Sequence, residues 1–270
     1  MKTETLAVPG ATLHYEVRGS GPVLLLICGG IYDAEGFAAL AGELAGERTV
    51  VTYDRRGNSR SPLDGPPALQ RIEEHADDAY RLLAAVGVTE DEPADVFGNS
   101  SGATIALELA ARHPELLRTV VAHEPPVFEL LPDADRFRTL MATVARTNRE
   151  SGWGAAMGVF GAGIGMGEEP VPGPPPAPEF AARMQQNIPF FVTYEVPPVS
   201  AYRLDLDALR AAATRIMPAA GAASTGEPPN RVALELATRL DTTAVLFPGG
   251  HGGFGNARPF AERLRSTLDA

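Results

Sequence analysis

The segment Gly98-Asn99-Ser100-Ser101-Gly102 carries the clearest chemical signal in the chain. An apolar run, Asp95-Val96-Phe97, precedes it, and a helix-like run over residues 103–110 follows. A serine flanked by glycines at positions −2 and +2, between a strand and a helix, is typical of a sharp turn that exposes the serine hydroxyl. Only Ser100 has this spacing, so it is the candidate nucleophile. Ser101 is expected to offer its backbone N–H.

A serine hydroxyl needs a base to accept its proton, and His251 is the base that the sequence favours. His251 lies in Phe247-Pro248-Gly249-Gly250-His251-Gly252-Gly253-Phe254, after the last apolar run. Glycines on both sides would let this loop arch over the edge of a sheet. Serine, acid and histidine in that chain order are expected for this kind of catalytic set. The other histidines are His14, His75, His113 and His123, of which His123 is a secondary candidate.

The acid that orients the histidine has two candidates, Glu124 and Glu227. A common place for it is the loop after the predicted strand over residues 214–219, but no aspartate occurs there. Ala223 or Ser224 stands at its approximate position. Glu124 stands at the end of the predicted strand that follows the helix after the sharp turn Gly98–Gly102 (the elbow), one strand away from Ser100. We therefore favour Glu124, and Glu227, at the entry to a helix, is the alternative.

Backbone N–H groups are needed to stabilise the oxyanion of a tetrahedral intermediate. The N–H of Ser101 is one candidate, and Gly29 or Gly30, in the loop after the apolar run 23–27, is the other. Cys28 is interpreted as a small buried residue rather than a second nucleophile. The segment Asp54–Ser61 is interpreted as a structural turn with charge-paired arginines, with substrate contact as the alternative.

Strand-like and helix-like segments alternate along most of the chain, which predicts an α/β fold with a mostly parallel sheet covered on both faces. The first two strands are expected within 6–17, around a Pro-Gly turn. Further strands are expected at 23–27, 49–54, 94–97, 119–122, 214–219 and 243–247. Helices are expected at 34–45, 69–86, 101–112, 230–239 and 259–268.

The alternation stops after Pro125-Pro126, so residues 127–200 are expected to form an inserted lid on a core of residues 1–126 and 201–270. A glycine-rich run (161–167) and a proline-rich run (170–176) within the insertion are interpreted as loops. Apolar side chains of this lid could line a pocket above the sheet. The candidates for substrate binding are Trp153, Met157, Phe160, Ile188, Phe191 and Tyr194.

Composition restricts the classes of partner and site. The chain has 270 residues, 44% hydrophobic content and a net charge of −11, which argues against nucleic acid or an anionic membrane as a partner. Its one cysteine cannot form an internal disulfide, and no apolar segment is long enough to span a membrane. No secretory signal is visible, so a cytoplasmic protein is expected. The proposed set requires no metal or cofactor, and a homodimer remains open.

Together these segments resemble the α/β-hydrolase superfamily over nearly the whole chain. The motif Gly98–Gly102, the Cys28-Gly29-Gly30 stretch, the turn at Asp54–Ser61 and the His251 loop stand in the order of that family. The resemblance implies an α/β-hydrolase fold, with a mostly parallel sheet flanked by helices and an inserted helical lid.

A narrower resemblance is to the zearalenone lactone hydrolases. His123-Glu124-Pro125-Pro126 is similar to the motif in which those enzymes place their catalytic glutamate, and Gly221-Ala222-Ala223-Ser224 is similar to their Gly-Ala-Ser-Ser. The lid segment 187–191 and Pro197-Pro198 also resemble that family. Two positions depart from it: Phe191 stands where those enzymes have a substrate-contacting tryptophan, and Cys28 replaces an aspartate.

The sequence thus predicts a metal-independent serine hydrolase acting on a bulky hydrophobic ester or lactone, such as zearalenone. Ser100, His251 and Glu124 would form its catalytic set. Other reactions on the same scaffold, such as carbon–carbon bond hydrolysis or perhydrolysis, would use a similar set of residues. A non-catalytic small-molecule binder is the alternative from a different class.

Overall fold

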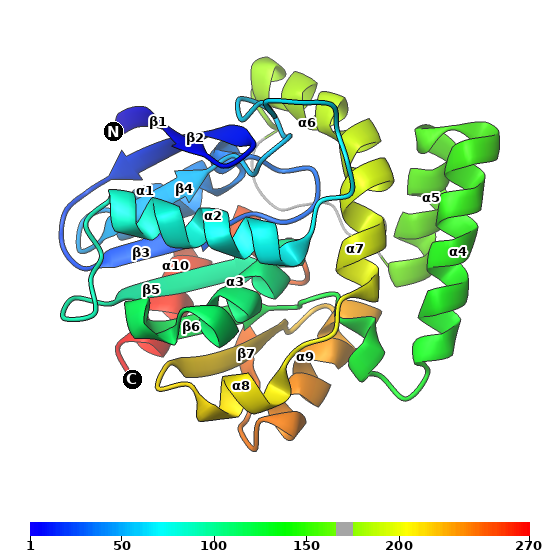
Figure 1. Ribbon diagram of the computed structural model, residues 1–270. Helices are drawn as coiled ribbons and strands as arrows, with labels where there is room; N and C mark the ends of the chain where they lie inside the picture. The colour runs from blue at the N-terminus through cyan, green and yellow to red at the C-terminus, as the bar shows by residue number, and fades with distance from the viewer. Residues whose placement is uncertain (166–174) are drawn as a thin grey trace.

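A single twisted sheet organises the chain (Figure 1). The computed structural model describes residues 1–165 and 175–270, and within these ranges eight strands pair in the order β1-β2-β4-β3-β5-β6-β7-β8. The pairings β1–β2 and β2–β4 are antiparallel, and the others are parallel. The strands are β1 (Lys2–Val8), β2 (Ala11–Arg18), β3 (Val23–Ile27), β4 (Thr49–Tyr53), β5 (Ala94–Asn99), β6 (Leu117–His123), β7 (Arg215–Gly221) and β8 (Val245–Phe247).

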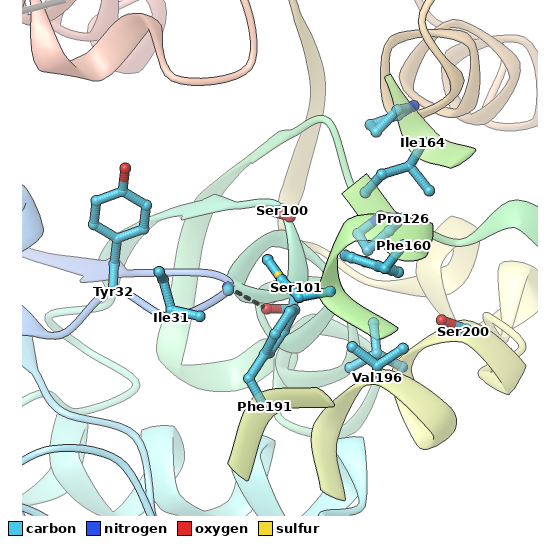
Figure 2. A pocket seen from close by; sticks show the side chains of 14 residues that line it. Ile31, Tyr32, Ser100, Ser101, Pro126, Phe160, Ile164, Phe191, Val196 and Ser200 are labelled. Atoms are coloured by element: carbon cyan, nitrogen blue, oxygen red, sulfur yellow. Dashed lines mark hydrogen bonds between the residues drawn. The ribbon is translucent and has the colours of Figure 1, made fainter. Parts of the chain in front are cut away.

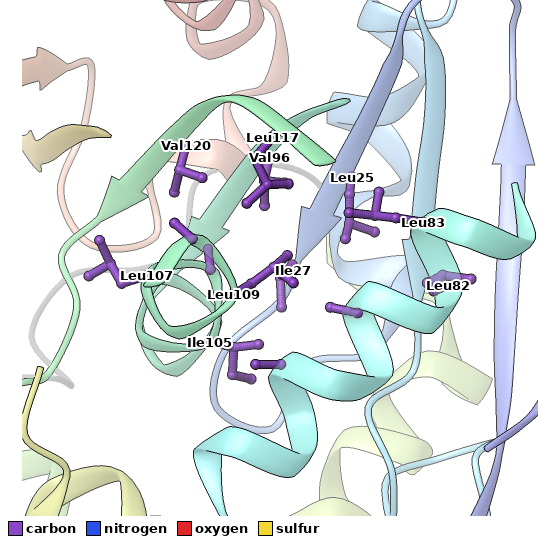
Figure 3. Packing of buried hydrophobic residues seen from close by; sticks show 14 of the residues in the cluster. Leu25, Ile27, Leu82, Leu83, Val96, Ile105, Leu107, Leu109, Leu117 and Val120 are labelled. Carbon is purple, nitrogen blue, oxygen red and sulfur yellow. The ribbon is translucent and has the colours of Figure 1, made fainter. Parts of the chain in front are cut away.

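Helices cover both faces of this sheet because the central strands are apolar on both sides. Leu25 and Ile27 of β3 pack with one set of helices, and Leu24 and Leu26 with the other. The first set is α2 (Ile72–Ala85), α3 (Ser101–Arg112), α8 (Leu206–Ala211) and α9 (Pro228–Arg239). The second set is α1 (Ala38–Leu44) and α10 (Ala257–Leu268). Figure 3 shows α2 and α3 against the sheet. The predicted fold class is confirmed.

Among the described residues between β6 and α8, most are helical, and these helices lie on the opposite side of the sheet from the two chain ends in Figure 1. They form α4 (Ala134–Ser151), α5 (Trp153–Ile164), α6 (Pro178–Phe190), a π-helical turn (Phe191–Glu195) and α7 (Val196–Ala201). These elements share a third apolar cluster with residues such as Phe128, Phe137 and Val192. Among the described residues, no helix has the length and apolarity needed to cross a bilayer.

The glycine-rich run differs from its prediction as a loop. Gly161–Ile164 complete α5, and Gly165 ends the helix in the left-handed conformation (φ +78°). A Cβ at Gly163 would lie 2.4 Å from Leu140 Cδ1, so glycine lets α5 approach α4 closely here. The rest of this run, Met166 and Gly167, and most of the proline-rich run lie outside the described residues.

Helix α2 begins at Ile72, later than the predicted start at Leu69. The Gln70 N–H donates to the Tyr194 carbonyl at 2.9 Å, which holds this segment against the insertion instead of in a helix. That carbonyl is available because Pro198, four residues later, has no N–H to donate to it. Arg71 then caps α2 together with Glu74.

The close packing of α3 on β3 predicts different effects of two glycine-to-alanine substitutions. A Cβ at Gly102 would lie 2.1 Å from the backbone oxygen of Ile27, which cannot move aside as a side chain could. We expect Gly102→Ala to lower the free energy of unfolding by about 1–3 kcal/mol. Gly158, exposed within α5, has open space around it, so Gly158→Ala should raise that free energy by about 0.5–1 kcal/mol. Urea unfolding of both variants measures this, and a Gly102→Ala protein as stable as the wild type would contradict the packing argument.

Candidate active site

Ser100 sits at the strained turn between β5 and α3. Its φ of +56° is rare for a residue with a side chain and costs on the order of 1–3 kcal/mol. The turn is held by a hydrogen bond from the Ser100 N–H to the His123 carbonyl (2.9 Å) and by one from Ala103 to the Ser100 carbonyl (2.9 Å). A Cβ at Gly98 would lie 2.3 Å from the Gly102 oxygen, which explains the glycines flanking the elbow.

The carboxylate of Glu124 is fully buried at the end of β6 and is surrounded by donors. Its Oε1 accepts hydrogen bonds from the Gly221 N–H (2.8 Å), from the Ser224 hydroxyl and from Asn230 Nδ2 (3.3 Å). Its Oε2 lies 2.7 Å from Nδ1 of His251. Glu124 also has a positive φ of +51°, and its N–H donates to the Ala219 carbonyl (2.9 Å). The strained backbone thus turns the carboxylate from β6 toward the His251 loop.

These contacts favour the ionised form of Glu124. Burial by itself raises the pKa of the carboxyl group, but the hydrogen bond from His251, nearby histidine charge and the Ser224 hydroxyl outweigh it and bring the pKa to about 2. Because the carboxylate remains charged near neutral pH, it favours the tautomer that carries a proton on His251 Nδ1, and it orients the ring.

The His251 loop is tied to the elbow through Asn99, the residue before Ser100. Asn99 Nδ2 donates to the His251 carbonyl at 3.0 Å and lies 3.1 Å from Nδ1 of His123. The two amide hydrogens of Asn99 can serve both acceptors. Asn99 therefore brings together the ends of β5 and β6 and the loop after β8. Nothing in the sequence pattern predicted that Asn99 would link the His251 loop to the strand ends.

The two acid candidates lie in different surroundings. Glu124 forms the hydrogen bond with His251, whereas Glu227 is the N-cap residue of α9, with its side chain beside Gly165. Ser224, found where the aspartate was expected, is buried and directs its hydroxyl to Glu124. A serine at the position of the usual aspartate was therefore a clue that this residue binds Glu124, but that role of Ser224 was not predicted. Asn230 gave no such signal.

The remaining histidines lie away from Ser100, apart from His123. His14 lies in β2 near Glu16, His75 is buried in α2 near Glu195, and His113 follows α3 and stacks on Tyr80. In the part of the chain that the structure describes, no group of three or more His, Cys, Asp and Glu side chains is arranged to hold a metal ion.

The candidate oxyanion loop, residues 28–32, lies directly against the elbow. A Cβ at Gly29 would lie 2.7 Å from Ser100 Cβ and 2.9 Å from Ser101 N. The Gly30 N–H donates to the Ser101 hydroxyl at 3.0 Å, and Gly30 has a positive φ of +57°. Cys28 is buried and its Sγ donates to the Asp33 carbonyl (3.1 Å); burial raises the pKa of this thiol well above its usual value, so it stays protonated.

A cavity with about 730 Å³ of empty space, including its opening to solvent, lies beside Ser100 (Figure 2). None of the described residues that line it is charged. Its walls are mainly apolar, and Tyr32 and Ser200 lie on opposite sides of the view in Figure 2. The lining residues are Gly30, Ile31, Tyr32, Ser100, Ser101, Pro126, Met157, Phe160, Ile164, Phe191, Val196, Val199, Ser200 and Pro229.

Three of the six candidate substrate-binding residues, Met157, Phe160 and Phe191, line this cavity. The other three lie elsewhere in the described structure. Trp153 begins α5 and is 43% exposed, and Ile188 packs within the apolar cluster of the insertion. The Tyr194 ring contacts Phe190 with centroids 5.3 Å apart. Sequence alone does not give the rotation of each helix, and this rotation decides which side chains face the cavity.

The buried ring of His123 predicts a pH dependence of stability. Burial lowers the pKa of His123 from 6.5 to about 4, so the native state binds this proton less readily than the unfolded state. The neutral ring thus contributes its full stability above pH 6.5, and this contribution is lost as pH falls toward 4. Between pH 7 and 5 the loss should be about 2 kcal/mol.

A comparison of wild type with His123→Gln measures this contribution, because a glutamine does not titrate. Urea unfolding at pH 7 and pH 5 should show a pH-dependent loss about 2 kcal/mol smaller in the variant. His75, whose pKa burial also lowers, is present in both proteins and cancels in the difference. Equal losses in the two proteins would contradict a buried neutral His123.

Comparisons with known proteins identify the fold family. A family model described as the alpha/beta hydrolase fold matches residues 22–162, just over half of the chain. The chain is 39% identical to the uncharacterized hydrolase YraK of Bacillus subtilis (strain 168), over 98% of this chain and 95% of YraK. It is 28% identical to zearalenone hydrolase from Bionectria ochroleuca, over 45% of this chain and 47% of that protein.

Solved structures show the same fold. A thermophilic esterase from Thermogutta terrifontis matches with a TM-score of 0.72 and 22% identity, over 100% of this chain and 98% of the esterase. The enol-lactonase from Burkholderia xenovorans LB400 matches with a TM-score of 0.66 and 19% identity, over 99% of this chain and 100% of the lactonase. The family match and the similarity to YraK show that this chain belongs to the alpha/beta hydrolase fold family and is a hydrolase.

Proposed function

We propose that this chain is a serine hydrolase of uncharged, hydrophobic carboxylic esters or lactones. The observation that carries the proposal is the 2.7 Å contact between His251 Nδ1 and Glu124 Oε2, in a loop that Asn99 ties to the Ser100 elbow. A strained nucleophile position, a base and a buried carboxylate thus meet at the carboxyl edge of the sheet.

In the first half of the reaction, Ser100 Oγ attacks the substrate carbonyl and His251 Nε2 accepts the serine proton. Since Nδ1 is engaged by Glu124, Nε2 is the nitrogen of the ring left for this transfer. Glu124 fixes the ring orientation and stabilises the imidazolium that forms. His251 then donates the proton to the leaving alcohol oxygen, which leaves an acyl-enzyme on Ser100.

The negative charge on the tetrahedral intermediate would be met by the N–H groups of Ser101 and Gly30. Gly30, rather than Gly29, is proposed because Gly30 lines the cavity with Ser100 and its N–H already points to Ser101 Oγ. A substrate oxygen would replace that hydroxyl at the Gly30 N–H or share the donor with it. Such preorganised donors stabilise the transition state more than the ground state.

In the second half, His251 removes a proton from water, and the resulting hydroxide attacks the acyl carbonyl. The Ser100 oxygen leaves and regains its proton from His251, which releases the carboxylic acid. For a lactone, the acid and the alcohol remain in one product molecule.

The lining of the cavity supports the proposed substrate class. Its apolar walls would bind a bulky hydrophobic group, and the absence of charge among the described lining residues disfavours an ionic substrate. We propose that residues 127–200 act as a lid, because α5, the π-helical turn and α7 all contribute to these walls. One relative is named a zearalenone hydrolase and one similar structure is an enol-lactonase. Lactones, including zearalenone, are therefore the first substrates to test.

Fluorophosphonate labelling tests the nucleophile. We expect one equivalent of probe on wild-type protein, on the peptide that carries Ser100, and none on Ser100→Ala. Ser20→Ala, at an exposed turn, is the matched control and should label like wild type. Hydrolysis of p-nitrophenyl esters and zearalenone should fall by about 10⁴-fold or more in Ser100→Ala. Retained hydrolysis in that variant, or a wild type that binds ligand without labelling, would overturn the proposal.

The two glutamates provide a matched pair for the acid. Glu124→Gln keeps the side-chain shape but removes the charge that orients and stabilises His251, so kcat should fall by about 10³–10⁴-fold. Glu227→Gln should change kcat by less than about threefold, since Glu227 stands at the N-cap position of α9 while His251 Nδ1 contacts Glu124. Steady-state kinetics on one ester decide between them, and the reverse pattern would transfer the acid role to Glu227.

A further inference from the structure

A buried ion pair joins the helical insertion to the core next to the oxyanion loop. Arg55, after β4, is 1% exposed, and Glu195, at the end of the π-helical turn, is 2% exposed. Arg55 Nη2 lies 3.0 Å from Glu195 Oε2, and Asn58 Nδ2 donates to Glu195 Oε1 at 2.9 Å. The two residues are 140 positions apart in the chain, so this ion pair connects two segments that are distant in sequence.

Arg55 uses its other hydrogens on the oxyanion loop. Nη1 donates to the Cys28 carbonyl at 2.5 Å, and Nη2 donates to the Gly30 carbonyl at 2.6 Å. The carbonyl between these two, that of Gly29, accepts from the Tyr32 N–H at 3.3 Å. Three consecutive peptide groups of the loop are therefore fixed through their oxygens.

Fixed carbonyls also fix the N–H groups, because C=O and N–H point in opposite directions in a planar trans peptide. The Cys28 oxygen determines the direction of the Gly29 N–H, and the Gly29 oxygen determines that of Gly30. Arg55 holds the peptides on both sides of the one that carries the Gly30 N–H, and the Tyr32 N–H holds that peptide itself through the Gly29 carbonyl. The Gly30 N–H therefore keeps its direction toward the elbow while Arg55 fixes its two neighbours with charged hydrogen bonds.

The shape of the insertion places Glu195 beside Arg55. Over Phe191–Glu195 the chain forms a π-helical turn, which puts Phe191 on the cavity wall and Glu195 in the core. After Val196 come Pro197 and Pro198, which lack N–H groups, and the Gln70 N–H donates to the Tyr194 carbonyl. A single π-helical turn of this kind within a helix is often found at functional sites.

Charge balance makes Arg55 depend on Glu195. His75 Nε2 lies 3.8 Å from Glu195, but burial lowers the pKa of His75 well below 6.5, so it remains neutral near pH 7. The neighbouring Arg56 is engaged by Asp78 at 2.6 Å. Arg55 is thus the charged partner that Glu195 contacts, and removal of Glu195 would leave the guanidinium buried without its counter-charge.

We propose that Arg55 and Glu195 are positioning residues, through which the insertion sets the direction of the oxyanion-loop N–H groups. This inference rests on the proposed hydrolase function and extends it to residues that do not line the cavity. It predicts that loss of the pair weakens transition-state binding more than substrate binding.

The test compares Glu195→Gln and Arg55→Lys with Asp78→Asn in full-length protein. Asp78→Asn breaks the adjacent buried Arg56–Asp78 pair, which does not contact the oxyanion loop. Arg55→Lys keeps the charge opposite Glu195 but cannot hold two carbonyls as the guanidinium fork does. For an ester substrate, kcat should fall about 10- to 100-fold in Glu195→Gln and Arg55→Lys, with KM within about threefold. Asp78→Asn should keep kcat within about threefold, even where Tm falls.

An arylboronic acid, which forms a tetrahedral adduct with an active serine, gives a second readout. Its Kd should rise by about the same factor as kcat falls in Glu195→Gln, and change little in Asp78→Asn. Wild-type kinetics in Glu195→Gln and Arg55→Lys, or equal kcat losses in all three variants, would overturn the positioning role. Failure of the proposed function itself would be seen separately: the wild-type protein would not bind the boronic acid covalently, and the Ser100→Ala variant would keep its activity.

Discussion

A buried carboxylate must have its charge and its lone pairs satisfied from within the protein, and Glu124 imposes this constraint on the centre of the structure. Three elements meet it: Gly221 at the end of β7 and Ser224 after it, Asn230 of α9, and the His251 loop. Because these donors come from three different segments, the carboxylate also fixes the positions of those segments. The contact with His251 is thus the product of a complete network and not an isolated hydrogen bond.

Two residues with positive φ, Ser100 and Glu124, stand at the ends of neighbouring strands β5 and β6. Each carries a side chain in a backbone region that favours glycine, so each stores strain that the packed sheet must hold. The close approach of β3 and α3, possible because Gly29 and Gly102 lack side chains, provides that support. The strain lowers stability at this edge of the sheet and positions the proposed nucleophile and the proposed acid.

Local sequence patterns predicted most of the fold and part of the candidate site. Continuous apolar runs and alternating helices predicted the parallel sheet, because buried strands and amphipathic helices each have a characteristic local pattern of apolar and polar residues. The elbow at Ser100 was predictable for the same reason, since a turn this tight requires glycines at fixed positions. Three of the six side chains predicted to bind substrate line the cavity, because helix rotation depends on tertiary packing. The charge pairing of the arginines within Asp54–Ser61 was predicted, but Glu195 as the partner of Arg55 was not, because the two lie 140 residues apart in the chain. The prediction of a loop was wrong for residues 161–164. Glycines occur in turns, but they also occur where two helices pack closely, as α5 and α4 do here.

In the proposed mechanism, Ser100, His251 and Glu124 act as one catalytic unit with an oxyanion site at Ser101 and Gly30. A crystal structure of the protein after reaction with a p-nitrophenyl alkylphosphonate tests it most directly. We expect phosphorus bonded to Ser100 Oγ, the phosphonyl oxygen within hydrogen-bond distance of the Ser101 and Gly30 N–H groups, and His251 Nδ1 still hydrogen-bonded to Glu124. Phosphorus on another residue, or a His251 ring turned to Glu227, would contradict it.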